Sequence, residues 1–378
     1  MTTKPKLWLM IILMMFPQFV ETIYSPVLPQ IAKKFSVNDQ QASQTIAIYF
    51  IAFAIGVVFW GIVSDRIGRR KAMIYGLITY GAGTIIALFT TDFNIILLAR
   101  VIAAFGVAVC SVVTQTILRD TFDKTELAKV FSIMGIALSI SPVAGLLTGG
   151  LVSAHYGYSG VFSTLLMLAI ALITATFVFL PETQKTSANE TRFIDVLKKM
   201  STDKMIWYSV FLVAAFNVML FSYYALAPFI FERAGYNTTQ FGYSGIALAI
   251  GSFIGGITNK NLVRAGYSSA KLILSAALLA ASGALGVWFL QKDIWFLLSM
   301  LFIVAAFGIA IPNILSQALN RYKQVAGTAG ALFGLMYYLI IGIGLIISGW
   351  VQNLGLILII CSAFSIGVAL KYKARAIL

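Results

Sequence analysis

Residues 61–71 read Gly-Ile-Val-Ser-Asp-Arg-Ile-Gly-Arg-Arg-Lys and join two long apolar stretches of the chain. Gly61 permits the close approach of another helix, and Gly68 permits a tight turn. The Asp65 carboxylate can accept hydrogen bonds from the N-terminus of a neighbouring helix or from a basic side chain. An ordinary basic loop explains the positive charges but not the fixed spacing of the glycines and the aspartate. We therefore interpret the segment as a structured turn between two helices.

Apolar stretches of similar length recur along the whole chain. Hydrophobic residues make up 60% of the sequence and charged residues 11%, with a mean hydropathy of +0.92, whereas roughly a quarter of the residues of a soluble domain are charged. A helix that spans a bilayer needs about 20 mostly apolar residues. Twelve segments qualify, at residues 7–29, 42–64, 72–91, 93–117, 127–153, 158–180, 206–231, 240–262, 269–290, 294–318, 325–349 and 351–370. They predict an all-α integral membrane protein with twelve transmembrane helices.

The net charge of +14 is concentrated on one predicted face of the membrane. The opposite face carries only four basic residues, which are Lys33, Lys34, Arg233 and Lys292. An excess of Lys and Arg in short loops marks the cytoplasmic side. Both termini are therefore expected to be cytoplasmic, and because topology accounts for the basic excess, we expect no nucleic-acid partner.

The longest hydrophilic stretch divides the twelve spans into six and six. It covers residues 182–205, between an N-terminal half at 1–181 and a C-terminal half at 206–378. Residues 255–260, Gly-Gly-Ile-Thr-Asn-Lys, resemble a degraded copy of residues 61–66 and support an internal repeat. Two similar halves with a substrate site near the membrane midplane are a common transporter architecture.

Prolines and glycines indicate where the spans end, bend or pack. Pro26 and Pro29 are expected to end the first span, and Pro228 the seventh. In the fifth span, Pro142 removes one helical hydrogen bond and introduces a bend. Gly145 and Gly149, four residues apart, form a face of small residues for close helix packing.

Only two charged residues lie deep inside the apolar stretches, and they have opposite sign. Glu21 belongs to a polar stripe on the first span, and Arg100 lies on the fourth. A charge at the bilayer centre costs at least ~2.5 to 3.5 kcal/mol on insertion scales, so such a residue indicates a functional site. Both residues lie roughly 10 to 12 Å from the outer ends of their helices at ~1.5 Å per residue. A contact between them is therefore geometrically possible.

Two mechanisms fit this pair. As a static ion pair, Arg100 would keep Glu21 ionised and contribute structure alone. As a switch, burial would favour the protonated acid, while Arg100 or a cationic substrate would favour the carboxylate. We favour the switch, with Glu21 as proton carrier, because Glu21 is the only acid within a predicted span. The remaining alternative is coupling through Asp65, Asp120 or another loop acid.

Several polar and aromatic residues inside the spans are candidates for substrate binding. Binding sites are often largely apolar, with a few placed polar groups. Aromatic residues inside spans also serve simple packing, so both interpretations stay open for each residue. The candidates are Gln18, Tyr24, Tyr49, Ser111, Asn217, Phe221, Tyr224, Asn313 and Tyr338.

The segment at residues 61–71 resembles the motif Gly-x-x-x-Asp-Arg-x-Gly-Arg-Arg/Lys of the major facilitator superfamily, and it matches at every defined position. The resemblance implies the major facilitator fold. It also implies that this loop latches the two halves together, with Asp65 facing the start of the eleventh span near Gly327. The implied members of this cytoplasmic gate are Gly61, Asp65, Arg66, Gly68, Arg69 and, as an additional partner, Arg119.

Further phrases narrow the resemblance and cover essentially the whole chain. The Pro142, Gly145 and Gly149 pattern is similar to the antiporter motif Gly-Pro-x-x-Gly of this family, with Ser141 in place of the first glycine. Four more phrases resemble the bicyclomycin-resistance (Bcr/CflA) branch of drug:proton antiporters. They are Arg-Asp-Thr-Phe at 119–122, Leu-Pro-Glu-Thr at 180–183, Ile-Pro-Asn at 311–313 and Ala-Gly-Thr-Ala-Gly-Ala-Leu at 326–332.

Together these features predict a proton-coupled efflux transporter that exports a small organic molecule by alternating access. We expect no enzyme activity, no metal site and no cofactor other than the coupling proton, because no Walker loop, metal-ligand cluster or nucleophile with a base is visible. We expect a monomer surrounded by lipid in a bacterial inner membrane. The alternatives are a dedicated exporter of a metabolite or siderophore, an importer, or a membrane receptor that transports nothing.

Overall fold

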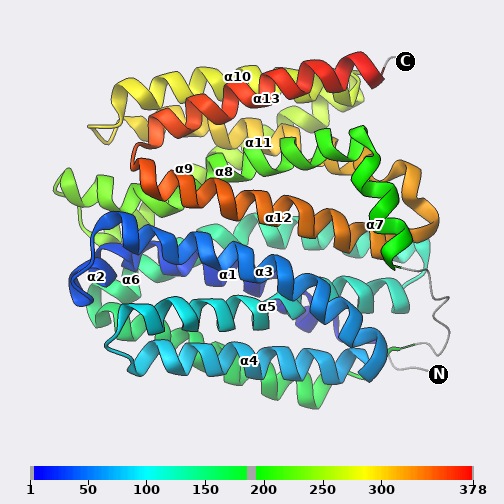
Figure 1. Cartoon of the computed structure of the whole chain (residues 1–378), viewed down its shortest axis with the longest axis horizontal. Coiled ribbons are helices and arrows are strands. Elements are labelled where there is room, and N and C mark those ends of the chain that lie inside the picture. Colours follow the sequence, from blue (N-terminus) through cyan, green and yellow to red (C-terminus); the bar gives the residue numbers. More distant parts are fainter. Residues whose placement is uncertain (1–3, 185–192, 377–378) are drawn as a thin grey trace.

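The computed structural model describes residues 4–184 and 193–376, and every regular element in these ranges is a helix (Figure 1). This confirms the all-α fold. The elements are α1 (Leu7–Tyr24), η1 (Ser25–Val27), α2 (Leu28–Lys34), α3 (Asp39–Ile67), α4 (Arg69–Phe89), α5 (Phe93–Thr121), α6 (Lys124–Phe179), α7 (Phe193–Thr202), α8 (Lys204–Arg233), α9 (Thr238–Arg264), α10 (Ser269–Leu290), α11 (Phe296–Ala318), η2 (Asn320–Val325), α12 (Ala326–Val351) and α13 (Leu354–Ala376).

The helix α6 contains two membrane crossings. It has 56 residues, about 84 Å at ~1.5 Å per residue, against a hydrocarbon core of ~30 Å. Gly157 interrupts it with a φ of 62° and a ψ of −159°. The described ranges contain 11 helices that are long and apolar enough to cross a membrane. With α6 counted twice, they make twelve crossings.

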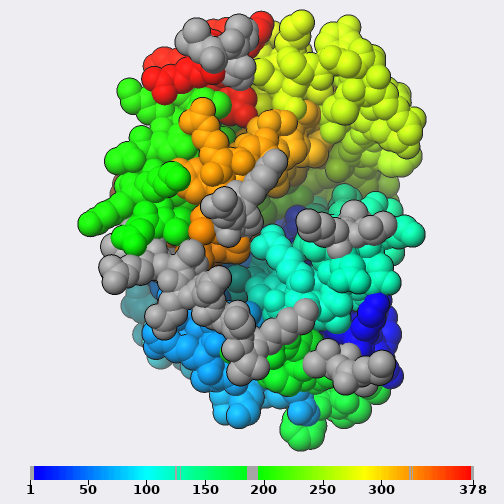
Figure 2. All heavy atoms as spheres, turned by 90° about the vertical axis from the view of Figure 1, so that its right-hand side faces the viewer, coloured from blue at the N-terminus to red at the C-terminus, as the bar shows by residue number. Residues whose placement is uncertain are grey.

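The helices form two groups that lie side by side (Figure 1). Helices α1 to α6 make up one group and α8 to α13 the other, and the groups meet where α3 packs on α12 and α6 packs on α9. We call the end of the bundle that carries residues 61–71 the motif end, and the end that carries the start of α3 and the end of α12 the seam end. Figure 2 views the motif end, with α11, η2 and α12 (orange) on one side and α5 and α6 (cyan to teal) on the other.

The second crossing of each group begins with the same local structure. Asn38 accepts a hydrogen bond from the backbone N–H of Gln41, whose side chain accepts one from Asn38. Asn237 and Gln240 form the same capping box at the start of α9. Such reciprocal caps satisfy backbone donors that a helix start leaves free. The matching caps add a structural repeat that the sequence comparison of residues 61–66 with 255–260 had not included.

The α-helical part of the first span ends at Tyr24, just before Pro26, whereas the predicted stop at Pro228 is wrong. Pro26 lies in η1 and Pro29 in the first turn of α2, so the helical path continues to Lys34. Proline fits the first positions of a helical segment, because the N–H that it lacks has no helical partner there. Pro228 lies within α8, which continues to Arg233. A proline is acceptable inside a membrane helix because groups on neighbouring helices can satisfy the backbone carbonyl that it leaves without a partner.

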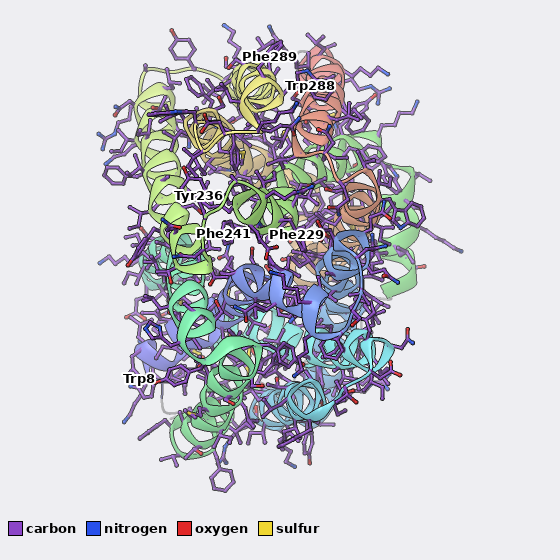
Figure 3. The ribbon with its side chains drawn as sticks, turned by 90° about the vertical axis from the view of Figure 1, so that its left-hand side faces the viewer. Trp8, Phe229, Tyr236, Phe241, Trp288 and Phe289 are labelled. Carbon is purple, nitrogen blue, oxygen red and sulfur yellow. The ribbon has the colours of Figure 1, made fainter. Side chains whose placement is uncertain are left out.

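Exposed aromatic side chains lie near the ends of several spans. Trp8 at the start of α1 and Trp288 and Phe289 at the end of α10 are exposed, whereas Phe229 and Phe241 are buried at the seam end (Figure 3). Tryptophan is enriched where the bilayer meets water. These positions agree with a bundle whose two ends lie at membrane interfaces.

Candidate transport site

Helices α1 and α5 bring the two intramembrane charges into one buried region. Glu21 is 9% exposed and Arg100 is 2% exposed. Within the described residues they form no direct ion pair, although the charge of Arg100 acts on Glu21 across the gap. The pair is therefore close enough to interact but is not bonded.

Two tyrosine rings hold the Arg100 side chain. The guanidinium carbon lies 4.0 Å from the centroid of the Tyr24 ring and 4.5 Å from that of Tyr49. Both distances lie within the range at which a cation is attracted to an aromatic face. The Nε atom of Arg100 is buried and has no hydrogen-bond partner in the described structure.

An aromatic cluster connects this region to the second group of helices. The ring of Phe50 on α3 lies 4.4 Å from that of Phe221 on α8, and Phe53 lies 4.9 Å from Tyr338 on α12. Glu21 is within electrostatic reach of Tyr224 and Tyr338. The buried acid of the first group therefore faces tyrosines of the second.

Most of the predicted substrate-binding residues lie around this cluster or on helices that border it. Tyr24, Tyr49, Phe221 and Tyr224 are buried, and Tyr338 is half-buried. The side chains of three further candidates, Gln18, Ser111 and Asn217, are half-buried. Their roles in binding stay predictions.

The amide of Asn313 takes part in packing between two helices. Its amide nitrogen donates to the Asn259 side chain at 2.6 Å and to the Ile309 carbonyl at 2.8 Å. These bonds occupy the amide nitrogen and fasten α11 to α9. Asn259 is the residue that corresponds to Asp65 of the first group, and a role of Asn313 in substrate binding stays a prediction.

At the motif end, Arg69 organises the predicted gate residues. Its guanidinium binds the carboxylates of Asp65 and Asp120, the latter at 3.1 Å, and donates to the Ser64 hydroxyl at 2.9 Å. These bonds connect the end of α3, the start of α4 and the end of α5. A Cβ at Gly61 would lie 3.6 Å from Val112 Cγ2, an ordinary packing distance. The predicted gate cations Arg66 and Arg119 are both exposed.

Glu182 is a structural member of this network that the sequence analysis did not single out. Its carboxylate accepts hydrogen bonds from the backbone N–H groups of Arg69 at 2.9 Å and Arg70 at 3.3 Å, at the N-terminus of α4. A Cβ at Gly68 would lie 2.4 Å from Glu182 Oε2. The signal in the sequence was the Leu-Pro-Glu-Thr phrase, which places an acid directly after the end of a span.

Among the residues whose side chains the structure describes, Asp65 forms no hydrogen bond or ion pair with the start of α12, where the implied contact would lie. Asp65 binds Arg69, and its carbonyl accepts a hydrogen bond from Gln184. A Cβ at Gly327 would meet nothing within 4 Å. The physical reason is that the contacts between the two groups gather at the seam end, away from the start of α12.

The residues of the predicted antiporter motif pack α6 against α1. A Cβ at Gly145 would lie 2.0 Å from the Thr22 hydroxyl, and one at Gly149 would lie 2.3 Å from the Ile23 carbonyl. Ser141, which stands in place of the glycine of the family motif, donates to the Met15 carbonyl at 2.8 Å. Pro142 lies inside the same helix. This face therefore supports the helix that carries Glu21.

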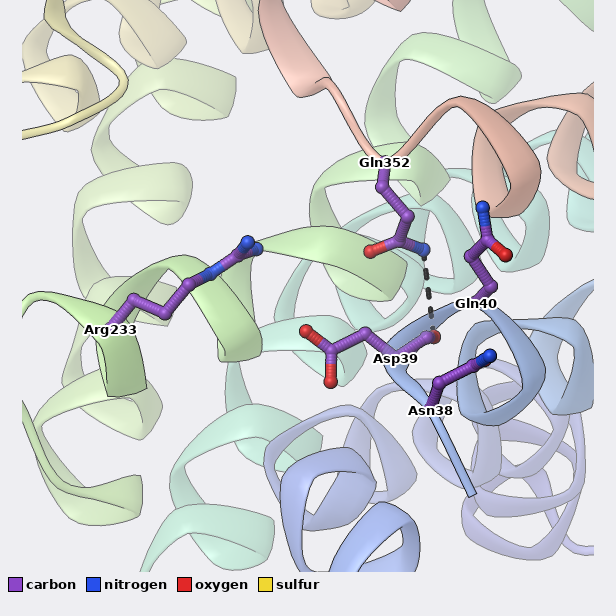
Figure 4. A pocket seen from close by; sticks show the side chains of 5 residues that line it. All are labelled: Asn38, Asp39, Gln40, Arg233 and Gln352. Atoms are coloured by element: carbon purple, nitrogen blue, oxygen red, sulfur yellow. Dashed lines mark hydrogen bonds between the residues drawn. The ribbon is translucent and has the colours of Figure 1, made fainter.

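Glutamine side chains join the two groups at the seam end. Gln44 donates to the Ile346 carbonyl at 3.1 Å, and Gln40 donates to the Trp350 carbonyl at 2.8 Å. Gln352 donates to the Ser43 hydroxyl at 3.1 Å. These three glutamines are called the amide seam below, and sequence analysis missed them because polar residues near span ends are common. A pocket of about 320 Å³ beside the seam is shown in Figure 4, lined by Asn38, Asp39, Gln40, Arg233 and Gln352.

The fold and this buried site define a multi-pass membrane transporter rather than an enzyme. The chain belongs to the Major Facilitator Superfamily, whose family model matches residues 7–345. This confirms the resemblance that residues 61–71 suggested.

Curated relatives cover most of the chain at low identity. An uncharacterized transporter of Rickettsia felis is 27% identical over 97% of this chain and 95% of its own length. Multidrug resistance protein D of Escherichia coli is 24% identical over 87% of this chain and 84% of its own. A bicyclomycin resistance protein homolog of Haemophilus influenzae is 24% identical over 85% and 83%. The relatives thus include the branch that the sequence phrases resemble.

Solved structures share the fold over nearly the whole chain. A crystal structure of a D-xylose-proton symporter aligns with a TM-score of 0.76 and 16% identity, over 95% of this chain and 96% of that one. A bacterial homolog of the human lysosomal transporter Spinster, in an inward-facing and occupied conformation, aligns with a TM-score of 0.75 and 15% identity, over 98% and 96%. At these identities the likeness shows the fold alone.

Proposed function

We propose that the protein exports a small organic molecule in exchange for protons. The observation that carries the proposal is Glu21, a carboxylic acid buried among the described spans and facing aromatic residues of both helix groups. An ionisable residue in this setting marks ion or substrate pathways in membrane proteins. The multidrug and bicyclomycin resistance relatives support export of a drug-like substrate.

In the proposed cycle, Glu21 carries a proton when substrate is absent and releases it when substrate binds. The two groups, residues 1–181 and 206–378, rock about the aromatic cluster and expose the site to one side at a time, while residues 182–205 join them. A membrane potential contributes ~2.3 kcal/mol per 100 mV for each net charge that crosses. One proton per cycle would therefore drive measurable accumulation.

The proposed location is a bacterial inner membrane, with both termini and the motif end in the cytoplasm. The excess of basic residues in the motif-end loops supports this orientation. With the seam end closed, the structure then corresponds to a state that is shut toward the outside. We propose that the transporter acts as a monomer, since two pseudo-repeated groups in one chain supply both sides of the site.

A second candidate function is favoured by Arg100. Its buried cation has no carboxylate bonded to it among the described residues, so an anionic group of a metabolite or siderophore could bind there. Such a substrate would make the protein a dedicated exporter, or an importer, of an acid.

The test is flux through purified protein in liposomes under an imposed pH gradient, with bicyclomycin, fluorescent organic cations and small organic anions as separate substrates. Coupled export predicts that the gradient accelerates flux of one class and that Glu21→Gln abolishes this acceleration. Glu126→Gln is the matched control, because Glu126 is an exposed acid. Flux that ignores the gradient would reject proton coupling, and gradient-dependent flux that survives in Glu21→Gln would reject Glu21 as the carrier.

A further inference from the structure

The charge of Arg100 is stabilised by aromatic rings, which is unusual for a buried cation. Its guanidinium lies between the Tyr24 and Tyr49 rings, at 4.0 and 4.5 Å from their centroids, and no carboxylate is bonded to it among the described residues. A charge moved out of water needs compensation from its surroundings. Here the negative faces of two aromatic rings supply this compensation. The Nε atom of Arg100 has no hydrogen-bond partner in the described structure.

Tyr49 also contacts the turn of α1 that carries Glu21. Its hydroxyl donates to the Pro17 carbonyl at 3.5 Å. In an α-helix this carbonyl is the partner of the N–H four residues later, which belongs to Glu21. Tyr24 lies three residues after Glu21 and therefore on the same face of α1. The two rings thus touch the cation, and the helix that presents the acid carries or binds both of them.

The other titratable groups around the pair are mostly tyrosines. From the elements packed against Glu21 and Arg100, these groups are Tyr24 of α1, Tyr49 of α3, Tyr80 of α4, Cys110 of α5, Tyr224 of α8, and Tyr337 and Tyr338 of α12. None of them is a second carboxylate. The closest strong partner that Arg100 could gain after a small movement is therefore Glu21.

We propose that Tyr24 and Tyr49 are positioning residues that hold Arg100 between their rings and so keep it out of a direct ion pair with Glu21. The separation leaves Glu21 free to gain and lose a proton, whereas a bonded guanidinium would fix it as the carboxylate. This inference rests on the proposed proton coupling for its role in transport. The geometry that it describes can be tested without transport.

The test follows protonation of Glu21 by its reaction with dicyclohexylcarbodiimide, which adds to protonated carboxyl groups in apolar surroundings. The full-length protein in liposomes is labelled across a pH series, and the Glu21 peptide is quantified by mass spectrometry, with Glu21→Gln as the blank. In Tyr49→Leu the released guanidinium pairs with Glu21, so the pH of half-maximal labelling falls by about one unit. Tyr49→Phe keeps the ring and stays closer to the wild type.

The matched control is Tyr322→Leu. Tyr322 is a buried tyrosine with the Lys199 ammonium 5.6 Å from its ring centroid, and its partners, Lys199 and Asp203, do not belong to the residues around Arg100. Its labelling curve should coincide with that of the wild type. Tyr24→Leu repeats the test should Tyr49→Leu not fold, and it should also shift the curve to lower pH.

Unchanged or raised midpoints in the folded Tyr24→Leu and Tyr49→Leu variants would overturn the proposal. Flux through wild-type protein that ignores a pH gradient, together with shifted labelling curves, would reject proton coupling while leaving the role of the rings intact. Flux that depends on the pH gradient, together with unshifted labelling curves, would support proton coupling and reject the role of the rings. The two failures are therefore distinguishable.

Discussion

At the scale of single residues, Gly68 is required for two separate reasons. Its φ of 98° is a conformation that side chains rarely adopt, and the Glu182 carboxylate fills the space that a Cβ would need. Sequence reasoning predicted the first reason from the motif. It could not predict the second, because Glu182 is more than a hundred positions away and only folding brings it to the N-terminus of α4.

Gly68→Ala should therefore destabilise the protein more than Gly266→Ala. Gly266 also has a positive φ, 83°, but a Cβ there would meet nothing within 4 Å. The control substitution loses about 1 to 2 kcal/mol from backbone conformation. Gly68→Ala loses about 1 to 3 kcal/mol more, because its ψ of 153° lies in a backbone region that essentially only glycine adopts and because Glu182 must leave backbone donors. Thermal unfolding in detergent measures both variants, and equal shifts would contradict the role given to Glu182.

At the scale of elements, the local sequence predicted most of the helices but not the short helix between the two groups or the contacts between helices. The apolar spans were predictable because a membrane helix must be apolar over ~20 residues. The helix α7 was missed because it is short and polar, and Met200 and Val196 show their burial only against the folded bundle. The packing bond of Asn313 could not be predicted for a related reason, since its partner Asn259 lies on another helix.

Gly149→Ala should loosen the contact between α6 and α1. Its Cβ would press on the backbone of Ile23, which cannot move as a side-chain end can. Overpacking of this kind costs about 1 to 3 kcal/mol, and because α1 carries Glu21, transport should fall as well. Gly135→Ala on the same helix is the control, since a Cβ there meets nothing within 4 Å. Similar thermal stability and flux in the two variants would contradict this interface.

At the scale of the whole molecule, the structure shows one arrangement of the two groups, which is closed at the amide seam. The contact of Asp65 with the start of α12 that the family resemblance implies would belong to a different arrangement, closed at the motif end. Motifs carry the contacts of every state in the cycle. For this reason sequence reasoning predicted the architecture and could not predict which end is closed.

Gln44→Ala should shift the population toward opening at the seam end. Loss of one hydrogen bond across the seam is worth about 1 kcal/mol, or roughly a fivefold change in the ratio of the two states. The readout is labelling of a cysteine introduced as Ser111→Cys, in a background without Cys110 and Cys361, by an impermeant maleimide added at the seam side.

Gln30→Ala is the control for this change. Gln30 donates to the Ser153 carbonyl within the first group, so its removal should leave labelling unchanged. Equal labelling of the two variants would show that the Gln44 bond does not hold the groups together.

The amide seam also determines how the transporter responds to its surroundings. Its three glutamines are neutral at every physiological pH, and the ion pair that crosses the same end, Lys33 with Glu232, is exposed to solvent and therefore weak. Salt screens charges but has little effect on hydrogen bonds between amides. In the proposed orientation, acid or salt outside the cell would therefore not open the seam end, and opening would instead depend on the substrate and protons that the proposed cycle brings into the bundle.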